Sequence, residues 1–97
     1  LPGEEKEKLP EGELGIPVEE LSDKVEEVEG LLVEGGIEGE GTHHLERTGG
    51  PGQNVYLTST AIDLQSLVGK KVHVWGENLS GIKAGYLMDV VKVKVLD

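Results

Sequence analysis

The stretch VYLTSTAIDLQSLVGKKVHVWG, residues 55–76, decides the fold of this chain. Residues 55–58 alternate between apolar and polar side chains, which predicts a β-strand with one face in a core. Residues 61–68 fit one or two helical turns, whose apolar side chains can cap that core. A glycine then opens a second alternating run, residues 70–76. The stretch therefore predicts a strand, a short helix and another strand, in that order.

Two further strands are predicted ahead of this stretch. Residues 26–38 are rich in valine, leucine and isoleucine, and we expect the strand to bend at the glycine pair 35–36. Residues 42–47 alternate between two faces, which predicts a second strand. The glycine-rich run that follows, residues 47–54, has the composition of a hairpin loop.

The last predicted strand spans residues 86–96. Its end alternates cleanly, so we expect Val91, Val93 and Val95 to face inward and Lys92 and Lys94 to face water. Upstream the alternation changes phase, because Asp89 shares its parity with Val91. We therefore expect a β-bulge near Asp89.

The order strand, strand, strand, short helix, strand, strand is the layout of the OB-fold. The fold class predicted is therefore all-β: a five-stranded OB-like Greek-key barrel with one short helix between strands 3 and 4. An acidic N-terminal arm precedes it.

The residues sharpen this prediction. The run from Ile62-Asp63-Leu64 through Gly69-Lys70-Lys71-Val72 to Gly76 resembles small bacterial OB-fold domains of exported or envelope proteins, mostly of unassigned function. The resemblance covers residues 26–97, implies a secreted or cell-envelope location, and transfers no catalytic residue.

Charge divides the chain into two unlike parts. Residues 1–40 hold 14 acidic side chains and 3 lysines, whereas residues 41–97 hold 5 acidic and 6 basic ones. Residues 1–15 are rich in Pro, Gly and Glu and show no apolar periodicity, which predicts a flexible arm. We therefore divide the chain into an N-terminal arm, residues 1–24, and an OB-like domain, residues 25–97.

The segment between arm and domain is ambiguous. Apolar residues recur at spacings of 3, 4, 3 and 4 from position 18 to position 32, a heptad-like stripe that is typical of a helix. The competing interpretation is a strand that starts near Glu26. The pattern favours a short helix or turn over residues 17–24 followed by the strand, and leaves both interpretations open.

Several kinds of chemistry are excluded by composition. The chain has no cysteine, so it has no disulfide, no thiolate zinc site and no thiol nucleophile. Its hydroxyl residues lie in no nucleophile-elbow motif, and its glycine-rich stretches lack the lysine of a phosphate-binding loop. No apolar run approaches the ~18 residues that cross a bilayer. We expect a protein that is not an enzyme, has no membrane span and needs no cofactor.

One group of side chains is a candidate metal site. Alternation places His44, Glu46 and His73 on outward faces, where they can converge on a divalent metal if their strands are neighbours. Their spacing matches no standard metal motif. The alternative is that they are ordinary surface residues of a β-sheet.

Nucleic acid is a disfavoured ligand. Many OB-folds bind single strands on aromatic side chains and a basic groove, and Tyr56, Trp75 and Tyr86 are the only aromatic rings here. A net charge of −10 repels phosphate, although the acidic arm can regulate such a groove by shielding it. Asn78 begins an Asn-Leu-Ser sequence that matches a glycosylation site, and such short matches often arise by chance.

Two functional hypotheses follow. In the first, the arm docks on a neighbouring subunit and joins copies into an oligomer or an extracellular filament, with Leu9, Leu14, Ile16 and Val18 entering pockets. In the second, the chain is a monomeric envelope module that binds a ligand on its outer β face. The candidate side chains of that face are Tyr56, His73 and Trp75, and Tyr86 is a further candidate binding residue.

Overall fold

The structure is a computed structural model, and it describes residues 12–79 and 85–96. Within those ranges the chain forms six β-strands, three 3₁₀-helices and no α-helix, so the predicted all-β class is confirmed. The strands are β1 (Glu13–Gly15), β2 (Glu26–Glu34), β3 (His43–Glu46), β4 (Val55–Thr58), β5 (Lys71–Leu79) and β6 (Leu87–Val95). The 3₁₀-helices are η1 (Val18–Glu20), η2 (Pro51–Gln53) and η3 (Leu64–Leu67). No helix in the described part of the chain is long and apolar enough to span a membrane.

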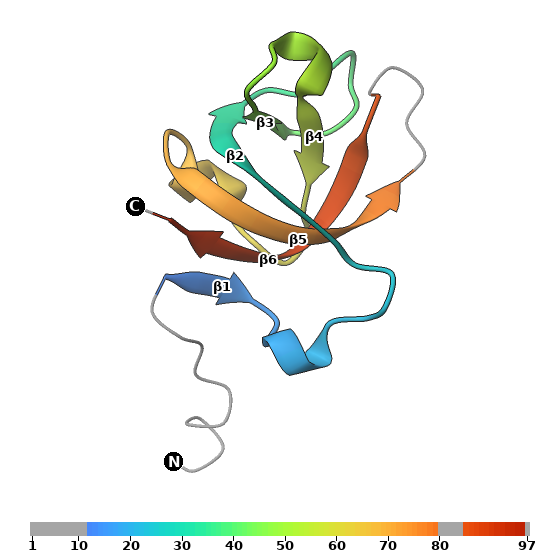
Figure 1. The fold of residues 1–97 in the computed structure, drawn as a ribbon, viewed down its shortest axis with the longest axis vertical. Coiled ribbons are helices and arrows are strands. Elements are labelled where there is room, and N and C mark those ends of the chain that lie inside the picture. The colour runs from blue at the N-terminus through green and yellow to red at the C-terminus, as the bar shows by residue number, and fades with distance from the viewer. Residues whose placement is uncertain (1–11, 80–84, 97) are drawn as a thin grey trace.

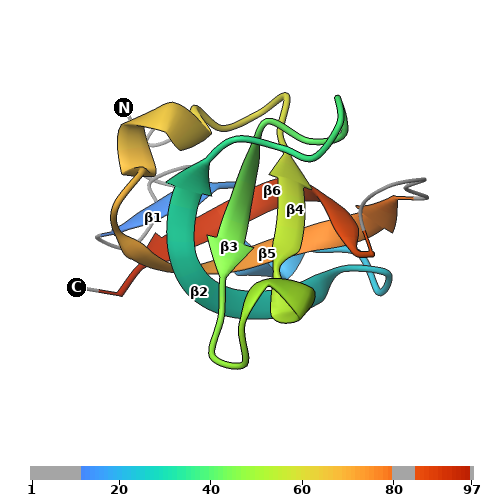
Figure 2. The same ribbon diagram turned by 90° about the horizontal axis from the view of Figure 1, so that it is seen from above.

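All six strands belong to one sheet (Figure 1). β2 pairs antiparallel with both β3 and β5, β3 pairs antiparallel with β4, and β4 runs parallel to β6. β5 and β6 are antiparallel, so the pairings lead from β2 through β3, β4, β6 and β5 back to β2. Figure 2 shows how strongly β2 curves to reach both of its neighbours. β1 pairs antiparallel with β6.

The core lies inside this curved sheet. Alternate residues of the strands point inward, as the alternation predicted for β3, β4 and β5. η3 covers the core with Leu64 and Leu67, at the place where one or two helical turns were predicted. The buried apolar residues are Leu32, Leu45, Val55, Leu57, Ile62, Leu64, Leu67, Val72, Val74, Leu87, Met88, Val90 and Val93.

The ambiguous segment is a turn followed by a strand. η1 occupies three residues of the predicted turn, and β2 begins at Glu26, where the competing interpretation placed it. The heptad-like stripe therefore does not mark a helix. β2 ends at Glu34, four residues earlier than predicted, because Gly35 adopts a φ of +110° that turns the chain out of the strand.

The predicted bulge lies close to its expected place. Trp75 is opposite Lys92 in the β5–β6 ladder, whereas the next residue, Gly76, is opposite Val90, so Val91 is the extra residue. The bulge lies two positions after Asp89, the residue expected to be near it. It reverses the alternation of β6 and thereby keeps apolar side chains on the inner face on both sides of the bulge.

The sixth strand was not predicted. β1 lies inside the segment predicted to be a flexible arm, and its three residues form a ladder with β6. Residues 1–11 of the arm lie outside the described residues. The boundary between arm and domain, drawn after residue 24, therefore separates β1 from the other five strands of the same sheet.

Candidate docking site for the N-terminal arm

The arm strand occupies an edge that another strand leaves free. β4 pairs with residues 87–89 of β6, and β5 pairs with β6 along its other side. β1 pairs with residues 92–94, on the side of β4, with Leu14 opposite Val93. Beyond the ladder, the Val95 amide donates to the Gly12 carbonyl (2.8 Å) and the Ile16 amide donates to the Val91 carbonyl (3.1 Å). The arm thus satisfies backbone groups of β6 that would otherwise form an exposed sheet edge.

Lys92 lies at the centre of this contact. It is 1% exposed, and its Nζ lies 2.5 Å from Glu13 Oε1 and donates to the Ile16 carbonyl (3.1 Å). The same Nζ is 5.5 Å from the centroid of the Trp75 ring. The prediction that Lys92 faces water is therefore wrong. Its side chain does point away from the core, but the arm covers it.

The buried ammonium group of Lys92 depends on partners that the arm supplies. A buried ammonium group is costly unless a charged or hydrogen-bonding partner compensates its lost hydration. Both partners come from the arm, a carboxylate from β1 and a carbonyl from the residue after it. The Glu13 side chain is only 15% exposed, so neither charge is fully screened by water.

Gly15 allows the close approach of the two strands. A Cβ at this position would lie 2.1 Å from the Val91 carbonyl oxygen and 2.9 Å from the Lys92 Cα. Its φ of +99° is also one that other residues rarely adopt. A side chain at position 15 is therefore expected to separate β1 from β6.

On the outer face of β2, β5 and β6, the contacts of the site extend beyond the arm to His73 and Trp75. His73 Nδ1 lies 2.7 Å from Glu29 Oε2, and its Nε2 lies 2.8 Å from Glu27 Oε1. The His73 ring also packs on Trp75, with 4.3 Å between the ring centroids. Two carboxylates and a histidine thus hold Trp75 in place beside the Lys92 amine.

The structure does not bring the three candidate metal ligands together. His44 Nε2 is 3.4 Å from Glu46 Oε2, but His73 lies across β2, against other carboxylates. His44 is opposite Val33 and His73 opposite Glu29, four residues apart on β2, or roughly 13 Å at the usual rise of a strand. The described residues contain no group of three or more His, Asp or Glu side chains that could hold a metal.

The three aromatic rings lie in two places. Trp75 is on the arm side, whereas Tyr56 and Tyr86 line a separate hollow of about 430 Å³ together with Arg47. The Tyr86 hydroxyl donates to Glu26 Oε1 (2.5 Å), and burial together with that carboxylate raises the pKa of Tyr86 above its usual 10.0. The rings therefore do not form one stacking platform.

The predicted apolar anchors of the arm play unequal parts. Ile16 is half-buried and supplies backbone contacts, whereas Leu14 and Val18 are exposed. Leu9 lies outside the described residues. Sequence reasoning missed Glu13, Gly15 and Lys92. The first two lie in a segment without apolar periodicity, and a lysine that alternates with valines has the pattern of a solvent-facing residue.

Comparison with protein-family models, curated proteins and solved structures finds no match to this chain. The contacts of the arm with β6 are therefore the starting point for the function.

Proposed function

We propose that this chain is a non-enzymatic OB-fold module, secreted or held in the cell envelope, that assembles with further copies by exchanging its arm strand. The OB assignment is supported by the cycle of five pairings, the parallel pair β4–β6 and the position of η3 between β4 and β5. The resemblance of residues 62–76 to exported OB-fold domains supports the location.

The observation that carries the proposal is the docking of β1 on β6 around the buried Lys92. The edge of β6 accepts a strand of defined sequence, with a carboxylate for the lysine and a glycine where the backbones are closest. The arm of a second copy offers the same groups to the same edge. Exchange of an identical element between protomers keeps every contact and is a low-cost route to oligomers.

The joint between β1 and β2 suits such an exchange. Ten residues, 16–25, separate the two strands, and η1 is their only regular element. β1 itself contributes three register pairs to the sheet, so few contacts must be broken to release it. The arm, residues 1–24, holds 8 acidic and 3 basic side chains and the remainder holds 11 and 6, so exchange depends on the local contact of Glu13 with Lys92 and not on complementary net charge.

The test is the solution mass of the full chain by light scattering after size exclusion. We expect species larger than the 10.4 kDa monomer, and we expect Gly15→Val to shift the mass to the monomer. Gly52→Val is the matched control, because position 52 has open space for a side chain. A full chain that stays monomeric at every concentration would contradict the proposal.

A second candidate function is favoured by the hollow beside Tyr56 and Tyr86. Two rings and the Arg47 guanidinium around one concave surface can bind a small anionic or aromatic ligand. A monomeric full chain would make this hollow the place to look for a ligand. Titration with a short single-stranded oligonucleotide at low salt, followed through the Tyr56 and Tyr86 amide resonances, tests the nucleic-acid alternative directly.

A further inference from the structure

The edge of β6 that receives β1 is held in place from its other side. β5 pairs with β6 over eight register pairs, against three between β1 and β6, so the edge keeps its shape when the arm strand leaves it. A fixed sheet edge of this kind binds extended peptides as an added strand, with backbone hydrogen bonds for affinity and side-chain contacts for selectivity. The edge of β6 is therefore a preformed strand-binding surface that β1 occupies.

One position of the bound strand requires a carboxylate. The Lys92 Nζ is buried, and the arm supplies both its ion-pair partner, Glu13, and its hydrogen-bond acceptor, the Ile16 carbonyl. The carbonyl belongs to the backbone, so any extended segment provides one, whereas the carboxylate depends on the side chain. An uncharged or basic residue in place of Glu13 leaves the ammonium group covered by the strand without a counter-charge. The edge therefore selects a glutamate at this position.

A second position requires a glycine. A Cβ at position 15 would overlap the Val91 carbonyl oxygen and lie 2.9 Å from the Lys92 Cα, and both are backbone atoms that cannot turn aside. The φ of +99° at Gly15 is also one that other residues rarely adopt. Leu14, between the two selected positions, is 41% exposed, so the edge places little demand on its side chain. The sequence that the edge accepts is thus Glu, any residue, Gly.

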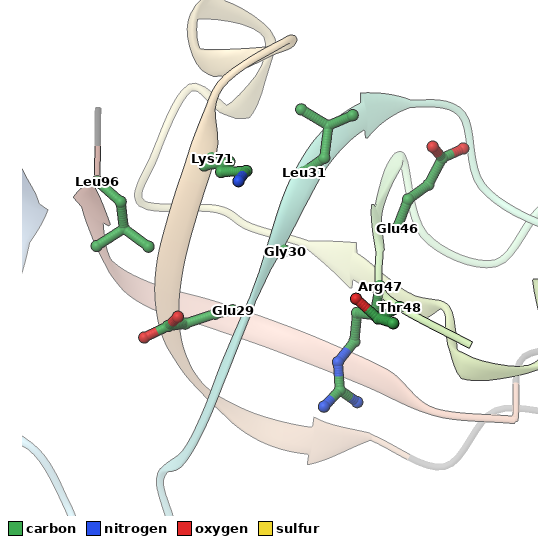
Figure 3. Close-up of a pocket in the computed structure, with 8 residues that line it drawn as sticks. All are labelled: Glu29, Gly30, Leu31, Glu46, Arg47, Thr48, Lys71 and Leu96. Atoms are coloured by element: carbon green, nitrogen blue, oxygen red, sulfur yellow. The ribbon is translucent and has the colours of Figure 1, made fainter. Parts of the chain in front are cut away.

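The hollow in Figure 3, of about 400 Å³, lies beyond the end of this edge and has no such selectivity. Two cations, Arg47 and Lys71, line it together with two carboxylates, so its charge favours neither an acidic nor a basic ligand. The Leu96 amide donates to the Lys71 carbonyl of β5 (2.9 Å), whereas the preceding amide, that of Val95, donates to the arm. Among the described residues, Val95 is therefore the last one of β6 whose amide the added strand uses.

We propose that the edge of β6 is a binding site for an extended segment of another protein, with the sequence Glu, any residue, Gly, and that β1 is its internal competitor. The partner segment adds to the sheet antiparallel to β6, with its glutamate on Lys92 and its glycine over Val91. The inference rests on the docking of β1 that carries the proposed function, and it names the sequence that the docking site recognises.

The tethered arm sets the condition under which a partner binds. A short flexible linker holds a segment near its site at an effective concentration of about 1 mM. A free segment with the same contacts therefore occupies the site of the natural chain only when its concentration approaches that value. A substitution at Glu13 or Gly15 weakens the competitor and leaves the site itself unchanged, because the groups that select the segment belong to β6.

The test adds a capped peptide of residues 12–18, GELGIPV, to the full chain carrying Gly15→Val. Trp75 is the only tryptophan, and the Lys92 Nζ lies 5.5 Å from the centroid of its ring, so its fluorescence reports occupation of the site. We expect the peptide to bind this variant more tightly than the natural chain, by about tenfold or more. Binding should also restore the hydrogen-exchange protection of the Val95 amide.

Altered peptides test the selectivity. Glu13→Gln in the peptide should weaken binding by about tenfold or more, because it removes the counter-charge of Lys92, and Gly15→Val should abolish binding. Leu14→Ala is the matched control and should bind as the unaltered peptide does, because this side chain is exposed. The full chain with Glu13→Lys is a second host, because Lys92 repels its arm, and it should bind the unaltered peptide in the same way.

The outcomes separate this inference from strand exchange between copies. Absence of binding to both hosts, or equal binding of all four peptides, overturns the peptide site. Equal affinity of the peptide for the natural chain and for the hosts overturns the role of β1 as competitor. A natural chain that is monomeric while its Gly15→Val variant binds the peptide keeps the site and overturns exchange. An oligomeric natural chain whose two host variants bind no peptide keeps exchange and overturns the site.

Discussion

At the scale of single residues, the fold buries a charged side chain at a position that the alternation of the strand predicted to face water. Lys92 follows the outward phase of β6, yet it is buried because Glu13 and the Ile16 carbonyl arrive over it from the arm. An outward lysine is normally free to hydrate, so its burial has to be compensated by these groups. Lys92 is therefore sensitive to changes in a segment that is remote from it in sequence.

Removing the carboxylate is expected to cost more than removing the lysine. Glu13→Gln leaves the Lys92 ammonium without its counter-charge, so we expect the free energy of unfolding in urea to fall by about 1–3 kcal/mol. Detachment of the arm limits this loss, because water can then reach Lys92. Lys92→Met removes the charge and keeps the contact with Trp75, and we expect a smaller change. A larger loss of stability in Lys92→Met than in Glu13→Gln would contradict the conclusion that Glu13 compensates the buried charge of Lys92.

Tyr86 gives the fold a dependence on alkaline pH. Its pKa in the folded chain is raised by burial and by Glu26, so the folded state keeps the phenol proton to higher pH than the unfolded state does. The associated stability is fully present below the usual Tyr pKa of 10.0 and is lost as the pH rises through the folded pKa. Thermal melts between about pH 8 and pH 11 should show this loss in the natural chain and not in Tyr86→Phe. Tyr56→Phe is the matched control, and a loss that persists in Tyr86→Phe would assign the effect to other groups.

At the scale of elements, β1 is the part of the sheet that is least firmly held. It contributes three register pairs, against eight between β5 and β6, and it lies at one end of the strand order. Elements with few contacts open locally at lower free energy than the core. Under the proposed strand exchange, β1 is the strand expected to exchange most readily between copies.

Hydrogen exchange should separate the arm contact from the rest of β6. The Val95 amide donates to Gly12 of the arm, whereas the next amide, that of Leu96, donates to Lys71 of β5. We expect Val95 to exchange faster than Leu96 in the natural chain. Gly15→Val should remove the protection of Val95 and leave Leu96 protected. Equal loss at both amides would mean that β1 and β5 open together.

At the scale of the whole molecule, the proposed assembly is expected to depend on charge and concentration. The exposed carboxylates of the described part of the arm, such as Glu19 and Glu20, are screened by salt, whereas the ion pair between Lys92 and Glu13 is largely shielded from water. Copies of net charge −10 repel one another, so assembly by strand exchange is expected to strengthen as salt screens that repulsion.

The salt dependence can be measured on the natural chain and on Lys71→Glu. Raising NaCl from about 0.05 M to about 0.5 M should raise the average mass in light scattering, since the Debye length falls several-fold and the repulsion between copies is screened. The variant is more negative than the natural chain by two charges, so it should start from a lower mass and respond more. A mass that falls with salt would indicate docking guided by opposite charges in place of this repulsion.

How much of the fold the sequence predicted depends on how local each feature is. The alternation of β3, β4 and β5, the short helix before β5 and the bulge in β6 were all predicted, because each depends on residues adjacent in the chain. The strand β1 was missed, since three residues among glycines, prolines and glutamates carry no periodic signal. The spread of the candidate ligands was also missed: alternation gave the outward face of His44 and His73 but not the distance between them.

The sequence by itself thus determined the all-β class, the order of the elements and the division of charge between the two halves of the chain. Only the tertiary structure decided that Glu13–Gly15 is a strand, that Lys92 is buried and that the histidines lie apart. The physical reason is that these features depend on which strands become neighbours. Lys92 and Ile16, for example, are 76 positions apart, and their contact forms only when the arm reaches the edge of β6 that β4 leaves free.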